Sequence, residues 1–546
     1  MDDSAAVAPR SVELGSDDRS GASEPPAVAS AGEVPASGAS PVVLDVRNLV
    51  TYFYTYDGVV RALEGVSFKL RRAETLGLVG ETGCGKSVTM FSITRLVPDP
   101  PGRVVSGTAL YRGANLLWGI ESEAKFKPVK GTNRVKVKRS FRRVKAGQAR
   151  VGSVRGGGIA MIFQEPSQAM NPIFPIYDQV GESILEHRGV ELVGELLAAH
   201  PDPAAFEAAA DEIRRAVEAG DTAALREATR RLGTAVGLAS AGVQAYYLAR
   251  QEMAEGRPDY DPSASLKRIA RRLYLSGVQR GFLRRELQRL EAERDLRHTY
   301  FEEMRQGRSD RIARGRAQAR RFRARMREFG YRLPVVKRRV SRPLRDELFW
   351  RVVQALEGVQ IANPVQVARG FPHELSGGML QRVMIAMALA SDPEILMADE
   401  PTTALDVTIQ AQILELMNEL RHRRGTAILL VTHDLAVIAE VADRVAVMYA
   451  GQIVEMAPVK SLYARPLHPY TQGLLASIPR FDQPGKELAS IPGSVPNLIY
   501  PPSGCRYHPR CPHAMPICKE SRPPLTVEGE NHHVACFLYS GPTVQE

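Results

Sequence analysis

The sequence predicts an α/β fold: a mixed sheet flanked by helices, with a long helical insertion and a cysteine-containing tail. Short apolar runs that end at a glycine, a glutamine, a carboxylate or a histidine are typical of buried parallel strands, and they lie at residues 75–80, 158–163, 394–398 and 426–431. From about residue 190 to 345 the composition changes to Ala, Glu, Arg and Leu at helical spacing. Strand-like runs on both sides of a helical stretch therefore carry the fold prediction.

The elements follow one another in a regular order. Residues 42–70 alternate apolar and polar side chains, which is typical of antiparallel strands. The run at 75–80 enters a glycine loop, and a helix from 86 to about 96 is then stopped by prolines. After the helical stretch we expect helices at 376–390, 408–421 and 435–442, and a strand at 444–449. We therefore place a core domain at residues 42–460 and a tail at 461–546.

Size and composition limit the class of protein. At 546 residues the chain exceeds a usual single domain, so we expect one large core with insertions or tails. Hydrophobic residues make up 44%, but no stretch reaches the roughly 18 uninterrupted apolar residues of a membrane span. Residues 1–41 are rich in Ala, Ser, Pro, Gly and Asp, which is typical of a disordered tail and not of a secretory signal. We expect a soluble or peripheral protein whose membrane partner is a separate chain.

The net charge of +11 is concentrated in inserted segments. Residues 305–345 hold sixteen Lys and Arg against two Asp and Glu, an excess that accounts for the whole net charge. A second basic insert is expected at about 119–152. The Arg-rich helical insertion spans about 190–345, and a helical hairpin is one arrangement for it. A solvated helical decoration and a binding role are equally compatible with this pattern.

A glycine loop after the first strand has the pattern of a phosphate-binding loop. Backbone N–H groups of such a loop cradle phosphates, and the N-terminus of the following helix adds a favourable field. Lys86 is expected on the β- and γ-phosphates, and Ser87 is expected to bind Mg²⁺. Cys84 occupies a variable position and is interpreted as a spacer. The predicted ATP-binding residues of the loop are Gly80, Glu81, Thr82, Gly83, Cys84, Gly85, Lys86 and Ser87.

Polar residues at three later positions complete the predicted chemistry. Asp399 ends an apolar strand and is placed to bind Mg²⁺, while the next residue, Glu400, is placed to orient and polarise the attacking water. His433 follows another strand and can bridge Glu400 and the γ-phosphate. For the adenine we predict an aromatic side chain before the first run, Tyr56, with Phe53 as the competitor.

The combined set of motifs resembles the ABC ATPases. Gln164 resembles their Q-loop residue, with a catalytic and Mg²⁺-sensing role, and Asp406 resembles their D-loop. The signature loop, which binds the ATP held by the opposite subunit, is matched by Leu375, Ser376, Gly377, Gly378 and Met379. The resemblance implies an ABC-type P-loop NTPase core with an enlarged helical subdomain. Because one phosphate loop and one signature are present, it also implies half of a dimer that holds two ATP.

The C-terminal part narrows the resemblance. The segments at 467–477, 491–496 and 504–511 resemble the tail of oligopeptide/dipeptide (and nickel) importer ATPases, and the residues around Met379 and Asp406 suit the D-type subunit. The resemblance covers about 42–118, 155–190 and 345–540, and it does not explain either insert.

Four of the five cysteines lie in this tail, at Cys505, Cys511, Cys518 and Cys536. Four thiolates suit a [4Fe–4S] cluster or a structural Zn²⁺ ion, and free thiols are the third alternative. The spacing lacks the CxxC pairs usual in zinc ribbons, and related importer tails carry an iron–sulfur cluster. We therefore favour the cluster over zinc.

The sequence thus predicts an ATP-hydrolysing subunit of a bacterial peptide importer, bound peripherally to the cytoplasmic face of the inner membrane. The resemblance implies a second ABC ATPase subunit, two transmembrane permease subunits and an extracytoplasmic peptide-binding protein as partners, with no nucleic acid. The alternative is a soluble, non-transport ABC ATPase that acts on RNA or ribosomes through the Arg-rich insertion. A third role for this insertion, binding anionic lipid, is compatible with the importer.

Overall fold

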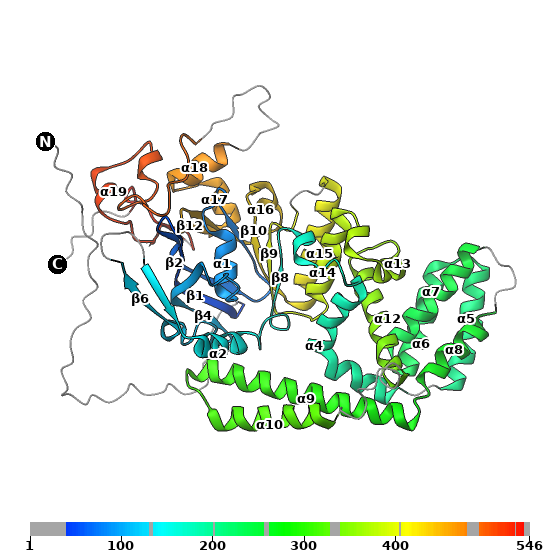
Figure 1. Cartoon of the computed structure of the whole chain (residues 1–546). Helices are drawn as coiled ribbons and strands as arrows, with labels where there is room; N and C mark the ends of the chain where they lie inside the picture. Colours follow the sequence, from blue (N-terminus) through cyan, green and yellow to red (C-terminus); the bar gives the residue numbers. More distant parts are fainter. Residues whose placement is uncertain are drawn as a thin grey trace. The chain divides into compact units, whose positions relative to one another are not determined.

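The computed structural model describes residues 40–129, 135–199, 202–255, 261–327, 339–402, 406–477, 491–529 and 531–539 (Figure 1). The expected N-terminal tail lies outside them except for its last two residues. Within the described ranges, none of the helices combines the length and the apolar character that crossing a membrane requires.

The predicted mixed sheet is present and has eight strands in the order β13-β14-β12-β11-β3-β10-β9-β8. Its central strands are parallel and almost entirely buried, as expected for a sheet covered by helices on both faces. These parallel strands are β3 (Thr75–Val79), β8 (Ile159–Ile162), β9 (Ile395–Asp399), β10 (Ala427–Val431) and β11 (Arg444–Tyr449). The antiparallel edge consists of β12 (Gln452–Pro458), β13 (Thr526–Val527) and β14 (His533–Val534).

A second, antiparallel sheet forms from the alternating residues at the start of the chain. Its order is β2-β1-β4-β5, with β1 (Val42–Tyr54), β2 (Val59–Arg71), β4 (Gly102–Tyr111) and β5 (Ala114–Asn115). The buried residues of this sheet share one apolar core with Leu76 and Leu78 of β3. The basic insert expected at about 119–152 forms a separate ribbon of β6 (Ala124–Pro128) and β7 (Val135–Arg139), followed by α2 (Phe141–Val151).

Helices of the core begin and end within a few residues of the expected positions. The main ones are α1 (Lys86–Ile93), α14 (Gly377–Leu389), α15 (Val407–Arg424) and α16 (Leu435–Val441). Shorter helices are α3 (Pro166–Ala169), α13 (Pro364–Arg369), α17 (Val459–Ala464), α18 (Pro469–Ala476) and α19 (Pro516–Glu520).

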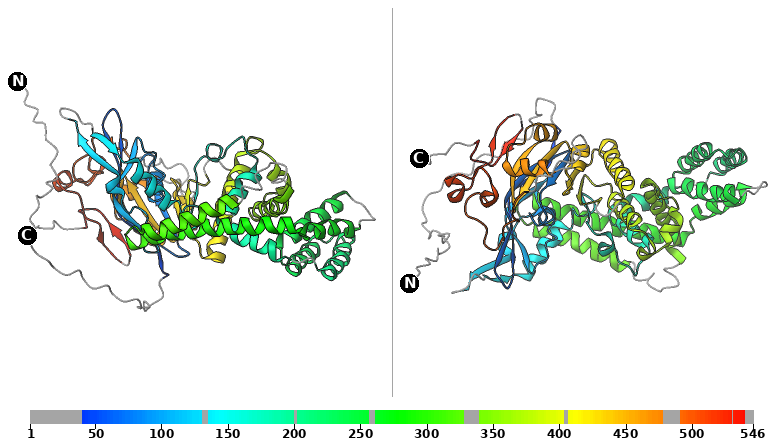
Figure 2. Two further views of the ribbon diagram at one scale, coloured as in Figure 1. Left: turned by 60° about the horizontal axis from the view of Figure 1, so that its bottom comes forward. Right: turned by 90° about the horizontal axis from the view of Figure 1, so that it is seen from above.

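The Arg-rich insertion is helical throughout its described residues (Figures 1 and 2). Several of its helices begin at an Asp or Ser whose side chain accepts hydrogen bonds from the first free N–H groups, as at Asp202, Asp221 and Ser276. The helices are α4 (Ile176–Ala198), α5 (Pro203–Glu218), α6 (Thr222–Val236), α7 (Ala239–Glu255), α8 (Pro262–Leu273), α9 (Gly277–Gln306), α10 (Arg311–Arg327) and α12 (Arg342–Gly358).

Helices α9 and α10 form a hairpin, but the insertion as a whole is not one hairpin, because helices α5 to α8 precede it. Helix α9 attaches the hairpin to the core. The Phe301 ring packs edge-on against Tyr111 of β4, and the buried Met304 joins the same core as the antiparallel sheet. Leu290 lies against Gly189 of α4. The insertion is therefore packed onto both the antiparallel sheet and the helical subdomain.

Residues of the tail expected at 461–546 join the main sheet, because β13 and β14 extend it along β12. The buried carboxylate of Glu455 on β12 accepts N–H groups of Leu467 and His468, and it also pairs with His532 at 2.7 Å. Strands of two residues are too short to show the alternation of apolar and polar residues that marks a strand in a sequence. The pairing of the tail with the main sheet was therefore not predicted.

Candidate nucleotide-binding site

The phosphate loop and three predicted site residues lie at the carboxyl ends of four adjacent parallel strands. The phosphate loop follows β3, His433 follows β10, Asp399 ends β9, and Gln164 follows β8. These strands lie side by side in the order β3-β10-β9-β8. Ligands of open α/β sheets bind at this edge because the loops there converge.

The phosphate loop has a backbone that only its glycines permit. Gly80 and Gly85 have φ angles of 152° and 104°, in the region that side chains disfavour. A Cβ on Gly80 would lie 2.2 Å from the carbonyl oxygen of Met448. The Lys86 ammonium donates to the carbonyls of Gly80 and Glu81, at 2.8 and 3.1 Å, so it lies in the concave side of the loop. Burial raises the pKa of the Cys84 thiol, which suits the interpretation of this residue as a spacer.

Two oxygen donors suited to Mg²⁺ lie together beside the loop. The Ser87 hydroxyl donates to the Asp399 carboxylate at 2.9 Å. Burial raises the pKa of Asp399 to about 6, while the hydrogen bond from Ser87 acts in the opposite direction. A hydroxyl and a buried carboxylate are ligands that this hard cation prefers, so the residues fit the ion.

Glu400 lies between Gln164 and His433. The Gln164 amide donates to one carboxylate oxygen at 2.9 Å, and Nδ1 of His433 lies 3.1 Å from the other. The backbone of Glu400 has a φ of 45°, a left-handed conformation that costs free energy for a residue with a side chain. Its N–H donates to the carbonyl of Val431 on β10, which holds it in that conformation. The three predicted catalytic residues therefore form one hydrogen-bonded group.

The signature residues lie at the start of helix α14. Ser376 caps α14 and accepts the N–H of Met379 at 3.4 Å. No hydrogen bond among the described residues joins residues 375–379 to the phosphate loop of the same chain. Asp406 caps α15 in the same manner, by accepting the N–H of Ile409, and residues 403–405 of its motif lie outside the described residues. Gln381, farther along α14, donates to the carbonyl of Pro401, the residue after Glu400, at 2.7 Å.

The two candidate aromatic residues for the adenine occupy different environments. Tyr56 lies in the turn after β1 and is 78% exposed. The Phe53 ring is partly buried, and it lies so close to Gly102 that a Cβ there would be 2.7 Å from the ring. An accessible ring is needed for stacking, so the structure favours Tyr56 and the assignment stays a prediction.

Comparison with known proteins decides the family. The family model described as "ABC transporter" matches residues 63–245 and 269–403, together more than half of the chain. The chain belongs to the ABC transporter family. A second model, described as "Oligopeptide/dipeptide transporter, C-terminal region", matches residues 454–518.

The sequences of named relatives align with this ABC protein over 91% of its length. The dipeptide transport ATP-binding protein DppD of Bacillus subtilis is 31% identical and is aligned over 91% of this chain and 94% of its own. A probable peptide ABC transporter ATP-binding protein of Sinorhizobium fredii, y4tR, is 32% identical over 91% and 95%. The oligopeptide transport ATP-binding protein OppD of Bacillus subtilis is 31% identical over 91% and 88%. The chain is an ABC-type ATPase of this subfamily, with ATP and Mg²⁺ as its ligands.

The tail of the ABC protein contacts the phosphate loop directly, which sequence analysis missed. The Tyr470 hydroxyl accepts the backbone N–H of Glu81 at 2.9 Å. The Arg510 guanidinium binds the Glu81 carboxylate with two hydrogen bonds of 2.7 and 3.0 Å, and its side chain is only 6% exposed. Arg506 donates to the carbonyl of Ala450, next to the glycine whose N–H binds Cys84. The tail therefore holds the loop from outside.

The four tail cysteines line a single pocket, together with His468, His508 and His513. Burial raises the pKa of the Cys505 thiol to about 11, and the other three thiols act in the same direction. No three His, Cys, Asp or Glu side chains among the described residues are arranged to hold a metal ion. The cysteines thus converge on one space, but in this arrangement their thiols do not form a single-ion site.

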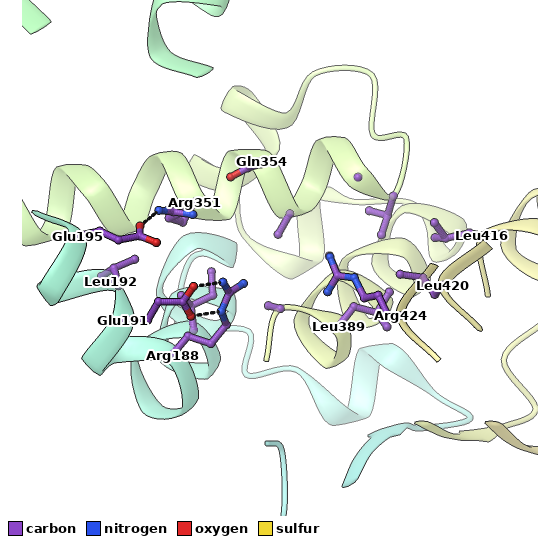
Figure 3. A pocket seen from close by; sticks show the side chains of 16 residues that line it. Arg188, Glu191, Leu192, Glu195, Arg351, Gln354, Leu389, Leu416, Leu420 and Arg424 are labelled. Carbon is purple, nitrogen blue, oxygen red and sulfur yellow. Dashed lines mark hydrogen bonds and ion pairs between the residues drawn. The ribbon is translucent and has the colours of Figure 1, made fainter. Parts of the chain in front are cut away.

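The pocket drawn in Figure 3 is distinct from the nucleotide site and lies between α4, α12, α14 and α15. Its charged residues neutralise one another: Arg188 pairs with Glu191 at 2.7 Å, and Arg351 pairs with Glu195. Arg424 is paired with Asp392. Because these arginines are already paired, the pocket offers little net charge to a ligand.

Proposed function

We propose that this ABC protein is an ATP-hydrolysing subunit that powers the import of peptides across the bacterial inner membrane. The observation that carries the proposal is the match of its tail, residues 454–518, to the C-terminal region of oligopeptide/dipeptide transporters. The same tail contacts the phosphate loop through Tyr470 and Arg510, so a feature of peptide transporters is built into the nucleotide site.

Each site residue then has a role that its position supports. The phosphate loop binds the phosphates of ATP, and Lys86 neutralises their charge. Ser87 and Asp399 hold Mg²⁺, which supplies charge neutralisation. Glu400 orients the attacking water, while Gln164 and His433 fix its carboxylate. The signature of a second subunit completes each site.

The proposed partners are a second ABC ATPase subunit, two transmembrane permease subunits and an extracytoplasmic peptide-binding protein. The protein would lie peripherally at the cytoplasmic face of the inner membrane. Purification of the tagged chain from native membranes in mild detergent tests this assembly, since two integral permease subunits should co-purify. In proteoliposomes, the peptide-loaded binding protein should stimulate ATP hydrolysis. Recovery of ribosomes or RNA, with no permease, would contradict the proposal.

We also propose that Cys505, Cys511, Cys518 and Cys536 hold a [4Fe–4S] cluster, with Zn²⁺ as the alternative. All four line one pocket, which supports a common ligand. Zinc–thiolate bonds of about 2.3 Å require four sulfurs within about 4 Å of one another. A [4Fe–4S] cluster accepts thiolates that are spaced more widely.

Anaerobic purification distinguishes these ligands. The cluster predicts a brown protein with iron and sulfide and an absorbance shoulder near ~400 nm. A Cys511→Ser variant should lose the colour, whereas Cys84→Ser, in the phosphate loop, should keep it. A colourless protein that contains zinc would exclude the cluster.

A further inference from the structure

Helix α10 exposes a continuous apolar stripe. Ile312, Phe322 and Met326 are 70%, 65% and 52% exposed, although such side chains are usually covered. Together with the exposed Gly315 and Ala319 they follow the spacing i, i+3, i+7, i+10, i+14, which places all five on one helix face. We call this the outer face of α10.

The opposite side of α10 packs against α9 and forms ion pairs with it. Ala317 and Ala324 are buried, and α10 lies alongside α9 (Figure 1). Arg314 pairs with the buried Glu303 at 3.1 Å, and Arg321 pairs with Glu293 at 2.6 Å. These contacts explain the residues of the inner side and leave the outer face without a role in folding.

Arginines border the outer face on both sides. Arg316 and Arg323 lie along one border and Arg311 along the other, and all three are exposed. None of them forms an ion pair with a carboxylate of the described residues. The helix contains eight arginines and no acidic residue. An apolar stripe between cationic borders is the surface of a helix that lies in a membrane interface.

We propose that the outer face of α10 binds an anionic phospholipid bilayer, with the apolar stripe entering the headgroup region and the bordering arginines on lipid phosphates. The charge complementarity is direct, since an inner leaflet rich in anionic lipid attracts basic segments by about fivefold in affinity per residue. Insertion of Phe322 and Ile312 adds the hydrophobic contribution that charge alone lacks. This contact is independent of the permease subunits and of the transported substrate.

The aliphatic residues distinguish a bilayer from RNA as the partner. An RNA-binding surface uses arginines on phosphates and aromatic rings that stack on bases. Ile312 and Met326 gain nothing from such contacts, but both gain from burial beneath lipid headgroups. The stripe thus favours a bilayer.

Co-sedimentation of the full chain with vesicles tests the proposal. The protein should bind phosphatidylcholine vesicles that contain phosphatidylglycerol, and it should not bind vesicles of phosphatidylcholine alone. The double variant Ile312→Ser/Phe322→Ser should bind at least about tenfold more weakly, because it loses the inserted apolar groups. The double variant Arg316→Gln/Arg323→Gln should bind about thirtyfold more weakly, because two lipid contacts are lost.

Matched controls separate this surface from general basicity. Arg230→Gln/Arg231→Gln removes two exposed arginines from α6, and Tyr274→Ser removes an exposed aromatic ring after α8. Both should bind vesicles like the unaltered protein, and all variants should keep the same circular dichroism and ATP turnover. The proposal is overturned if the protein does not bind anionic vesicles, or if the Ile312→Ser/Phe322→Ser variant binds them as tightly as the unaltered protein. It is also overturned if the protein binds a single-stranded RNA probe more tightly than vesicles.

Discussion

The ATP-binding core and the helical insertion bury their residues in different ways. Strands β3, β9 and β10 of the core are buried at every residue, and their ends carry the chemistry. Helix α10 of the insertion buries only Ala317 and Ala324 and exposes most of its arginines. The core is therefore constrained by the geometry of nucleotide binding. The insertion is constrained on one side by its packing against the core. On its other side we propose that the outer face of α10 is constrained by contact with the bilayer.

Glu400→Gln is expected to have the largest effect and tests the core. The amide has the shape of the carboxylate and its oxygen can still accept from Gln164, but it cannot act as a base, so ATP turnover should fall by about a hundredfold or more. Nucleotide binding should persist and trap a closed dimer, detectable by size-exclusion chromatography with ATP. Glu255→Gln, in the insertion, is the matched control. Normal turnover in Glu400→Gln would falsify the assignment of Glu400.

A pair of cavity variants compares the two regions at equal burial. Leu429 in β10 and Leu283 in α9 are both fully buried, so each Leu→Ala change should cost about 2–5 kcal/mol of stability. Thermal unfolding measures that cost. We expect Leu429→Ala to weaken ATP binding as well, whereas Leu283→Ala should keep it. Equal losses of ATP binding would mean that the insertion supports the nucleotide site, against the comparison drawn above.

His187 tests the junction between the regions. Its ring lies against Gly156 and Gly157 of the core and near Arg297 of α9. Burial, and to a smaller extent the Arg297 charge, lower the pKa of His187 to about 4, while Glu186 acts in the opposite direction.

The unfolded chain therefore binds a proton on this histidine between about pH 6.5 and 4, whereas the folded chain does not. Stability should fall by about 2 kcal/mol from pH 7 to pH 5 through this group alone. Chemical denaturation at both pH values measures it, with His187→Gln as the control. An unchanged pH dependence in that variant would contradict the buried neutral histidine.

Arg510→Ala is expected to have the smallest effect and tests whether the tail belongs to the core. Loss of its two hydrogen bonds to Glu81 should weaken ATP binding about tenfold, since charged hydrogen bonds contribute about 1.5–3 kcal/mol. Lys519→Ala removes an exposed charge from the same tail and should bind ATP normally. Isothermal titration provides both affinities, and identical values would show that the Arg510 contact is incidental.

The sequence was sufficient to predict the location of those site residues that lie at the ends of strands. Asp399, His433 and Gln164 could be placed together because each follows a short apolar run, and parallel strands bring such ends to one edge. The helical character of the insertion followed from composition and spacing, but its division into helices α5 to α10 did not. The left-handed backbone of Glu400 could not be predicted, because it depends on a hydrogen bond to Val431 on a neighbouring strand.

The contacts between the tail and the phosphate loop could not be predicted from the sequence either. Tyr470 and Arg510 are separated from Glu81 by about four hundred residues, and no local pattern marks such a pairing. The Tyr470 motif was recognised only as a family feature. Its physical role becomes visible only when the folded tail lies beside the loop.

The contact between tail and phosphate loop has a consequence for how much of the chain constitutes the ATPase. A chain shortened to end before residue 461 would retain every nucleotide motif from Gly80 to His433. It would nevertheless lose the strands that extend the sheet beside β12 and both side chains that hold Glu81. The smallest functional enzyme is therefore longer than the stretch that its motifs enclose. Shortened versions that bind ATP poorly would reveal a missing support, with the catalytic residues themselves intact.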